Sequence, residues 1–390
     1  MSLLLSGCIW NLERGEVGDI IDEYTDETFY ELPADIPAGE PGEIIRVRPM
    51  LEAPAGSQAW RVIYHSRDMA GNDIPVSGLV IVPDSPIGVG DRTIVSWAHP
   101  TTGSAPACGP SLDANPFDLI EGLYELLAAG YAVAATDYQG MSIDGPSSYL
   151  LGVTEGNNVI DAVRAAKLIP GTGLRDDVLL WGHSQGGQAA LFAAQQFKDY
   201  APELTLQGVA VAAPAADLNA LMTDDIVNLS GVTIASLAIP AMRAAYADRY
   251  SADEMNAILT PAGLEAIPSM EGLCLLKQNK ELHAIADPLI GNFVTSDPAT
   301  TEPWATVLKE NSAGGSSIGV PIFIAQGLAD ELVIPTATEG YVERLCAAGE
   351  HVEFEKYDGI THALIADVAV PKVIAWYEQV QAGNPITATC

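Results

Sequence analysis

The chain has 390 residues, 48% of them hydrophobic, which is enough for a large core, and one α/β domain with an insertion fits this length better than two equal domains. Its 51 acidic and 18 basic residues give a formal net charge of -33, which repels nucleic acids and anionic lipid head groups. We therefore expect no nucleic-acid partner, and no apolar run reaches the length of a membrane-spanning helix.

The N-terminal residues resemble the end of a bacterial lipoprotein signal, in which an apolar stretch leads into Leu5-Ser6-Gly7-Cys8 and the cysteine is lipidated. The alternative is a short tail with an incidental cysteine, since the charged start of such a signal is missing. Residues 9–28 are acidic and carry few apolar side chains. We interpret residues 1–28 as a signal remnant and acidic spacer, with a membrane tether through Cys8.

From residue 29 onward, predicted strands alternate with predicted helices, a pattern typical of a mostly parallel sheet covered by helices on both faces. An antiparallel pair is expected first, at 59–64 and 78–82, with a turn at Gly71-Asn72-Asp73. The elements that follow are strand 93–97, helix 119–129, strand 132–136, helix 159–168, strand 178–181, a helix after Ser184, and strand 208–213.

This alternation stops near Asp217 and resumes after Ser316. The pattern in between is mainly helical, and the segment is too long for an ordinary connection. The core then continues with strand 321–326, helix 336–348, strand 352–357 and helix 370–380. We therefore expect a core in two parts, residues 29–216 and 317–390, and a helical cap inserted over the active site at residues 217–316.

The pentapeptide Gly182-His183-Ser184-Gln185-Gly186 lies directly between a predicted buried strand and a predicted helix. A serine in this context predicts a nucleophile elbow, where flanking glycines are needed because larger side chains would collide in the tight turn. A second match to the same pattern surrounds Ser317, but a polar stretch precedes it instead of an apolar strand. We therefore assign Ser184 as the nucleophile and place Ser317 in a loop.

A serine nucleophile needs a histidine base and a carboxylate that orients the histidine, and after a nucleophile elbow they follow the serine in the order acid, then histidine. Of the six histidines, His362 follows the last predicted strand, where the base belongs. Asp330 follows the preceding core strand and is our choice for the acid. Glu331 is the rival because it is adjacent and chemically equivalent, and Asp358 is a weaker rival.

Two N–H donors should stabilise the oxyanion that forms when Ser184 attacks a carbonyl. One is the backbone N–H of Gln185, and the other comes from the loop after strand 93–97. Pro100 in that loop has no N–H, so Thr101 or Thr102 must donate, and we favour Thr101. Cys/His metal spacing and a glycine-rich phosphate loop are both missing from the sequence, so we expect no metal and no cofactor.

The predicted cap contains an apolar cluster between residues 232 and 246, and we expect Leu237 and Met242 of this cluster to line an acyl site. A polar substitution at either residue should then reduce activity on long acyl chains more than on acetate. The alternative is that these side chains pack only the core of the cap.

The chain resembles the secretory lipase family of α/β-hydrolases over nearly all of residues 29–390. The residues that carry the resemblance are Phe29-Tyr30, Pro41-Gly42, residues 96–103, Asp137-Tyr138-Gln139-Gly140, the elbow from Gly182 with its following Gly187, Asp330 and His362. The resemblance implies an α/β-hydrolase fold, a helical cap and ester hydrolysis, and it agrees with the triad chosen above.

The five cysteines are an odd number, which is explained if Cys8 carries lipid and the other four form disulfides. Four cysteines allow three connectivities. A Cys346–Cys390 bond would hold the C-terminus, and Cys108–Cys274 would then fasten the cap to the core, a pairing that the family resemblance also implies. Disulfides indicate an oxidising compartment outside the cytoplasm, so the protein would be secreted, periplasmic or an outer-membrane lipoprotein.

These observations predict a serine carboxylic ester hydrolase, a lipase or esterase, that acts through an acyl-enzyme on Ser184. The expected partner is a small-molecule or lipid ester, and a monomer is favoured. A serine peptidase or acyltransferase on the same fold is the first alternative, because a triad does not choose between ester and amide. The second alternative is a surface binding protein that has the same fold but no catalytic activity.

Overall fold

The computed structural model describes residues 29–84 and 92–390. It divides into two units, residues 1–37 and 38–390. In the described part of the first unit, the rings of Phe29 and Tyr30 meet edge to face with centroids 5.1 Å apart. Cys8 and the predicted spacer lie outside the described residues. Among the described helices, none combines the length and hydropathy needed to cross a membrane.

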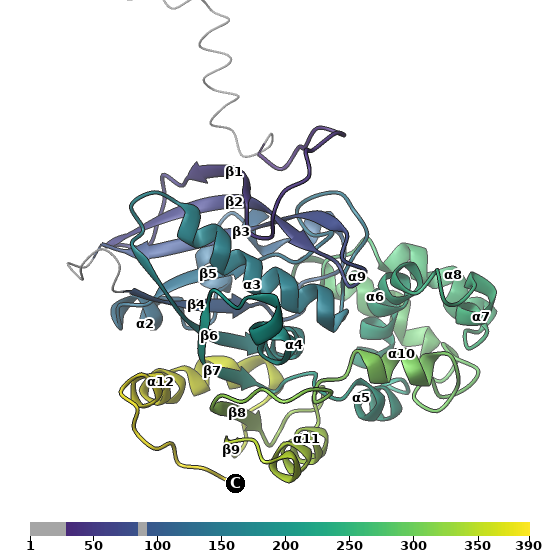
Figure 1. Cartoon of the computed structure of the whole chain (residues 1–390). Coiled ribbons are helices and arrows are strands. Elements are labelled where there is room, and N and C mark those ends of the chain that lie inside the picture. The colour runs from purple at the N-terminus through teal and green to yellow at the C-terminus, as the bar shows by residue number, and fades with distance from the viewer. Residues whose placement is uncertain (1–28, 85–91) are drawn as a thin grey trace, which may run out of the picture. The chain divides into compact units, whose positions relative to one another are not determined.

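Within the described part of the larger unit, nine strands form one sheet in the order β1-β2-β3-β5-β4-β6-β7-β8-β9 (Figure 1). The strands are β1 (Ile44–Pro49), β2 (Ser57–Arg67), β3 (Asp73–Pro83), β4 (Arg92–Ala98), β5 (Ala132–Thr136), β6 (Leu174–His183), β7 (Thr205–Ala212), β8 (Ile322–Gly327) and β9 (Val352–Tyr357). The pairs β1–β2, β2–β3 and β3–β5 are antiparallel, and all pairs from β5–β4 to β8–β9 in the sheet order are parallel. This arrangement confirms the predicted α/β-hydrolase sheet.

The central strands β4, β5 and β8 are buried along their whole length because both faces of the sheet are covered. Along β4, alternate side chains enter two separate cores: Val95 and Trp97 on one side, Ile94 and Ala98 on the other. The first core includes residues of α2 (Leu123–Ala128) and α12 (His362–Gln381). The second includes residues of α3 (Gly152–Leu168), α4 (Gln185–Tyr200) and α11 (Pro335–Ala348).

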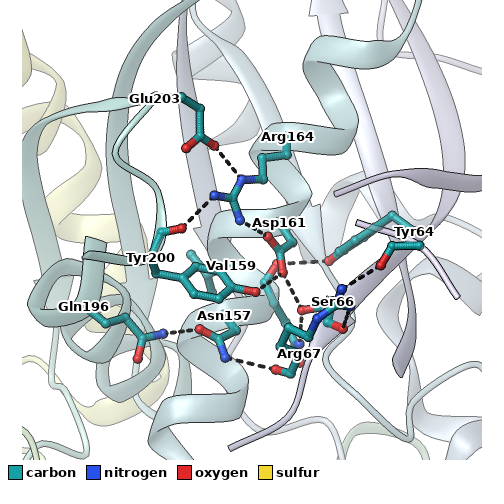
Figure 2. A network of polar contacts seen from close by, with 12 residues as sticks. Tyr64, Ser66, Arg67, Asn157, Val159, Asp161, Arg164, Gln196, Tyr200 and Glu203 are labelled. Atoms are coloured by element: carbon teal, nitrogen blue, oxygen red, sulfur yellow. Dashed lines mark hydrogen bonds and ion pairs between the residues drawn. The ribbon is translucent and has the colours of Figure 1, made fainter. Parts of the chain in front are cut away.

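A buried polar network joins α3 to its neighbours on the second face, as Figure 2 shows. The Asp161 carboxylate accepts hydrogen bonds from Ser66 of β2 and from the hydroxyl of Tyr200, both at 2.7 Å, and pairs with Arg164 at 2.7 Å. Burial raises the pKa of Asp161 to about 6, although these donors favour its charged form. The network therefore ties α3 to the sheet and to α4, the helix that begins beside Ser184.

Two helices begin earlier than the sequence predicts. The helix predicted at 370–380 is α12, which begins at His362 and continues through Pro371, so His362 lies at the start of a helix and not in a loop. A proline is typical of a helix start, which is why the sequence pattern placed the boundary too late. The helix predicted at 159–168 is α3, which begins at Gly152, and its buried polar first turns hid the apolar pattern.

Between β7 and β8 the chain forms only helices, 3-10 turns and loops within the expected range of 217–316, apart from one isolated bridge between Leu259 and Val294. The helices are α5 (Leu218–Asp225), α6 (Leu229–Ala245), α7 (Ala252–Asn256), α8 (Pro261–Met270), α9 (Leu275–Ala286) and α10 (Trp304–Glu310). Polar side chains accept hydrogen bonds from backbone N–H groups at the starts of four of them: Asp217, Asn228, Ser251 and Thr260. Such N-caps set the helix boundaries in this segment.

Within residues 29–84 and 92–390 the structure has two disulfides, with the pairing expected from the sequence. Cys108, in the loop after β4, bonds to Cys274 at the start of α9, with the Cα atoms 5.1 Å apart. Cys346 of α11 bonds to the C-terminal Cys390, with the Cα atoms 5.6 Å apart. The first bond joins the helical segment to the core, and the second holds the chain's end.

Replacing both Cys108 and Cys274 by serine should lower the free energy of unfolding by about 2 to 4 kcal/mol. The loss should exceed that in the matched Cys346→Ser/Cys390→Ser variant, because the first bond closes a separation of 166 residues and the second one of 44. Urea unfolding under non-reducing conditions measures both losses. A larger loss from the shorter loop would contradict this expectation.

Candidate active site

Ser184 lies between β6 and α4 with a left-handed backbone, φ 57° and ψ -118°. Few non-glycine residues adopt this region, so the surrounding structure must hold it there. The N–H of Ser184 donates to the carbonyl of Ala212 at 3.0 Å, and the Ser184 carbonyl accepts from the N–H of Ala215 at 3.0 Å. These bonds to the end of β7 fix the sharp turn that a nucleophile elbow requires.

Both glycines of the elbow occupy positions where a side chain has no space. A Cβ on Gly182 would lie 2.1 Å from the carbonyl oxygen of Gly186, and one on Gly186 would lie 1.9 Å from that of Ala98. Because these oxygens belong to the backbone of α4 and β4, they cannot move without disrupting both elements. Any larger residue would therefore push α4 away from the sheet. These short distances explain why glycine is needed at both positions of the elbow.

Three predicted residues meet through a continuous chain of hydrogen bonds. His362 Nε2 lies 2.9 Å from Ser184 Oγ, and His362 Nδ1 lies 2.7 Å from Asp330 Oδ2. The other oxygen of Asp330 accepts from the N–H groups of Leu332 and Val333, both at 2.9 Å. Asp330 is thus held in place from both sides, as the residue that orients the histidine must be.

The two rival acids, Glu331 and Asp358, are both exposed, and His362 Nδ1 is bonded to Asp330 instead. Burial lowers the pKa of His362, and its hydrogen bond to Asp330 only partly offsets this. The imidazole is therefore neutral near pH 7, the form that can accept the serine proton.

The loop after β4 approaches Ser184 from the other side. Thr101, Gln185 and Ser184 line the same cavity, and Gln185 is the first residue of α4, where the N–H has no intrahelical acceptor. Thr102 is occupied differently: its hydroxyl donates to Cys108 and its carbonyl accepts from Leu275. Thr101 lines the cavity and Thr102 does not, which favours Thr101 as the second donor.

The Asp137-Tyr138-Gln139-Gly140 motif supports this loop. The carbonyl oxygen of Asp137 lies 3.1 Å from His99 Nε2, and the Tyr138 hydroxyl donates to the carbonyl of His99 at 3.1 Å. Thr101 is itself held by a 2.8 Å hydrogen bond between its hydroxyl and that of Tyr149. The motif therefore positions the loop after β4 that carries Thr101, and it does not itself line the cavity.

The cavity beside Ser184 is mainly apolar and measures about 60 Å³. The apolar side chains of α5 and α6 that line it are Leu218, Leu221, Met222, Ile234, Ala238 and Met242. Met242 thus lies where we predicted, but Leu237 does not: it is fully buried among the apolar side chains of the core. The neighbouring Ala238 faces the cavity instead, since successive helical residues point about 100° apart.

Asp225 is a cavity residue that the sequence analysis missed. It ends α5 among apolar lining residues and accepts a hydrogen bond from the Asn228 side chain at 3.1 Å. Burial raises the pKa of Asp225 to about 7. An aspartate at the end of a predicted helix is common, so nothing in the neighbouring sequence pointed to Asp225.

Replacing Asp225 by asparagine should raise the melting temperature more at about pH 8 than at about pH 5. The folded protein keeps the proton on Asp225 up to a pKa of about 7, whereas 3.8 is the ordinary value. Because the folded state binds the proton more tightly, wild-type stability falls as the pH rises between these values, and asparagine does not titrate. Thermal unfolding at both pH values measures the effect, and a gain that shrinks with pH would contradict it.

Ser317 lies outside this site, as expected. Its hydroxyl donates to the Glu350 carboxylate at 2.7 Å, and the same carboxylate accepts from the N–H groups of Ile318 and Gly319. Its role is to hold the loop that leads into β8.

The fold and this serine, histidine and aspartate geometry are those of an α/β-hydrolase. The sequence profile described as "Secretory lipase" matches residues 118–389, and the chain belongs to this family.

Similar proteins include lipases and esterases. A protein named "Probable inactive lipase" from Mycobacterium tuberculosis is 24% identical over 93% of this chain and 83% of its own length. The trichothecene C-3 esterase of Fusarium sporotrichioides is 23% identical over 91% of this chain and 83% of its own.

Among solved structures, Candida antarctica lipase A aligns with a TM-score of 0.76 at 21% identity, covering 94% of this chain and 88% of that chain. The cell-wall-degrading esterase LipA of Xanthomonas oryzae aligns with a TM-score of 0.75 at 18% identity, covering 89% of this chain and 100% of that chain. These similarities establish the fold and support a hydrolase that acts on esters.

Proposed function

We propose that the protein is a carboxylic ester hydrolase that works through an acyl-enzyme on Ser184. The observation that carries the proposal is the unbroken hydrogen-bond chain from Ser184 Oγ through both ring nitrogens of His362 to the buried Asp330 carboxylate. This order of groups converts a weak hydroxyl nucleophile into a reactive one.

The proposed reaction has two halves. Ser184 Oγ attacks the ester carbonyl while His362 Nε2 takes the hydroxyl proton, and the same nitrogen then returns the proton to the leaving alcohol. The negative charge on the carbonyl oxygen is stabilised by the N–H of Gln185 and by Thr101. Water, activated by His362, then attacks the acyl-enzyme and releases the acid. Asp330 keeps the imidazole in the tautomer that both halves need.

The test of this proposal is hydrolysis of p-nitrophenyl acyl esters, measured beside matched peptide p-nitroanilides. Turnover of the esters with little cleavage of the anilides supports an esterase or lipase. Preferred cleavage of the anilides would favour the peptidase alternative, and a faster acyl transfer to an added alcohol than to water would favour an acyltransferase.

A non-catalytic role is the second candidate, and one relative at 24% identity is indeed named an inactive lipase. Against it, the geometry at Ser184, His362 and Asp330 is complete in this chain. Absence of any ester turnover in the purified protein, together with specific binding of a surface ligand, would favour this candidate.

The size of the cavity bears on the acyl group. At about 60 Å³ it is well below the roughly 300 to 1,000 Å³ of typical ligand pockets. In this arrangement of α5 and α6 the apolar cavity itself has room for only a short acyl chain, whereas a more open cavity of about 660 Å³, which shares Leu332 with it, lies at His362. We propose short-chain esters as the preferred substrates.

Met242→Ala should therefore raise the ratio of activity on hexanoate to activity on acetate by about threefold to tenfold, because it enlarges the apolar cavity. Leu237→Ala is the matched control on the same helix: it removes a core side chain and should lower the melting temperature without changing the ratio. A chain-length series of p-nitrophenyl esters gives both ratios. Equal losses on all chain lengths in Met242→Ala would favour a packing role only.

We also propose an extracytoplasmic location, which the two disulfides and membership of a family described as secretory support. Lipidation at Cys8 and a membrane tether remain proposals that mass spectrometry of the native protein can test. A monomer acting on a small-molecule or lipid ester fits a site built from one chain.

A further inference from the structure

A second histidine lies directly against the proposed base. His183, the residue before Ser184, packs its ring on the ring of His362 with centroids 4.7 Å apart and planes inclined by 40°. The side chain is buried, and His183 Nδ1 lies 2.6 Å from Glu121 Oε1. The active site thus contains two histidine–carboxylate pairs, of which the proposed reaction uses only one.

The fold holds Glu121 in this position. Its carbonyl oxygen accepts a 2.9 Å hydrogen bond from the indole of Trp181 on β6. Gly122, the next residue, has φ 79°, and a Cβ there would lie 2.6 Å from the side chain of Val370 on α12. Glu121 is therefore fixed between β6 and α12, the two elements that carry His183 and His362.

We propose that the His183–Glu121 pair is a positioning device that places a positive charge against the ring of His362 and keeps His362 unprotonated at mildly acidic pH. The inference rests on the proposed function, in which neutral His362 is the general base. It gives His183, the second residue of the elbow, a role in setting the pH range of the enzyme.

The charges support this direction. Burial alone would lower the pKa of His183, but the nearby Glu121 carboxylate outweighs it and the pKa lies above the ordinary value. A charged His183 in turn disfavours a second positive charge on His362, whose pKa burial also lowers. Because the two pKa values lie on opposite sides of the ordinary 6.5, ionised His183 and neutral His362 can coexist at a pH near that value.

Other titratable groups act on the same cluster and do not reverse the effect. They are Asp330 after β8, Asp367 of α12, Glu125 of α2 and His99 after β4. Asp330 and Glu121 both favour protonated His362, but burial and the charge on His183 outweigh them, so the pKa of His362 lies below its ordinary value. Burial lowers the pKa of His99, which therefore stays neutral, and burial raises that of Asp367.

The test is the pH profile of kcat/KM for a p-nitrophenyl ester, since its acid limb reports the ionisation of the free enzyme's base. In His183→Gln, the acid limb should move to higher pH by about one unit, because the positive charge is lost while the Glu121 carboxylate remains. The double variant His183→Gln/Glu121→Gln removes both charges, so its acid limb should lie between those of wild type and the single variant.

A matched control is His65→Gln, which disrupts another histidine–carboxylate pair away from the site, that of the buried His65 with the exposed Asp73 at 3.0 Å. Its acid limb should stay in the wild-type position. Melting temperatures of all variants establish that each is folded under the assay conditions. The pH dependence of Ser184 labelling by a fluorophosphonate provides a second profile that needs no ester turnover.

A purely structural role for His183 would lower the plateau rate and leave the acid limb where it is, and this result would overturn the inference. A limb that moves to lower pH in His183→Gln would overturn it as well. If wild type labels with fluorophosphonate but turns over no ester, the proposed function fails, while the labelling profiles still decide the role of His183.

Discussion

Ser184→Ala and His362→Ala are each expected to reduce ester turnover by roughly four to six orders of magnitude, because the serine and histidine act as one unit. Ser184 Oγ and His362 Nε2 lie 2.9 Å apart, so loss of either partner removes the same proton transfer. Neither side chain fills the core, and melting temperatures should stay close to wild type. Steady-state kinetics with a p-nitrophenyl ester measures the loss.

Ser317→Ala is the matched control for the serine, since Ser317 lies in the same sequence pattern but bonds to Glu350. It should retain wild-type turnover, and a fluorophosphonate should label Ser184 alone. Labelling at Ser317, or full activity in Ser184→Ala, would show that the nucleophile is misassigned.

Asp330→Asn should reduce kcat by about three to four orders of magnitude, through loss of the tautomer of His362 that can accept the serine proton. The amide can present an N–H to His362 Nδ1 where the carboxylate now accepts at 2.7 Å. It also loses the charge that receives the N–H groups of Leu332 and Val333. The kcat of the purified variant, compared at several pH values, measures the effect.

Glu331→Gln is the matched control, because this exposed neighbour carries the same acid group as the buried Asp330. Its activity should stay within about twofold of wild type, as for most surface substitutions. A Glu331→Gln variant that loses far more activity than Asp330→Asn would identify Glu331 as the acid.

Much of the site could be predicted because its signals are local. The elbow follows from sterics within five residues, where Gly182 and Gly186 leave no room for a side chain. Asp330 and His362 could be chosen because catalytic residues follow the strand ends in a set order, and few histidines compete. The boundary of α12 was wrong because Pro371 resembles a helix start.

When most of a helix is apolar, its sequence does not indicate which of its faces will line a cavity and which will pack in the core. Leu237 and Met242 are equally apolar and equally buried, yet only Met242 lines the cavity. The direction of each side chain depends on how α6 packs on α5 and on the core. The hydrophobic pattern would be the same if Leu237 faced the cavity and Met242 faced the core.

The sequence by itself therefore determined the α/β-hydrolase fold, the elbow at Ser184 and the residues that accompany it, because each rests on short-range sterics and chain order. Only the tertiary structure decided which groups surround them. Glu121 meets His183 across 62 positions, and Asp225 enters an apolar cavity, because β6, α12 and the helical segment converge there. Such contacts arise from packing between distant elements, and no periodicity within either element encodes them.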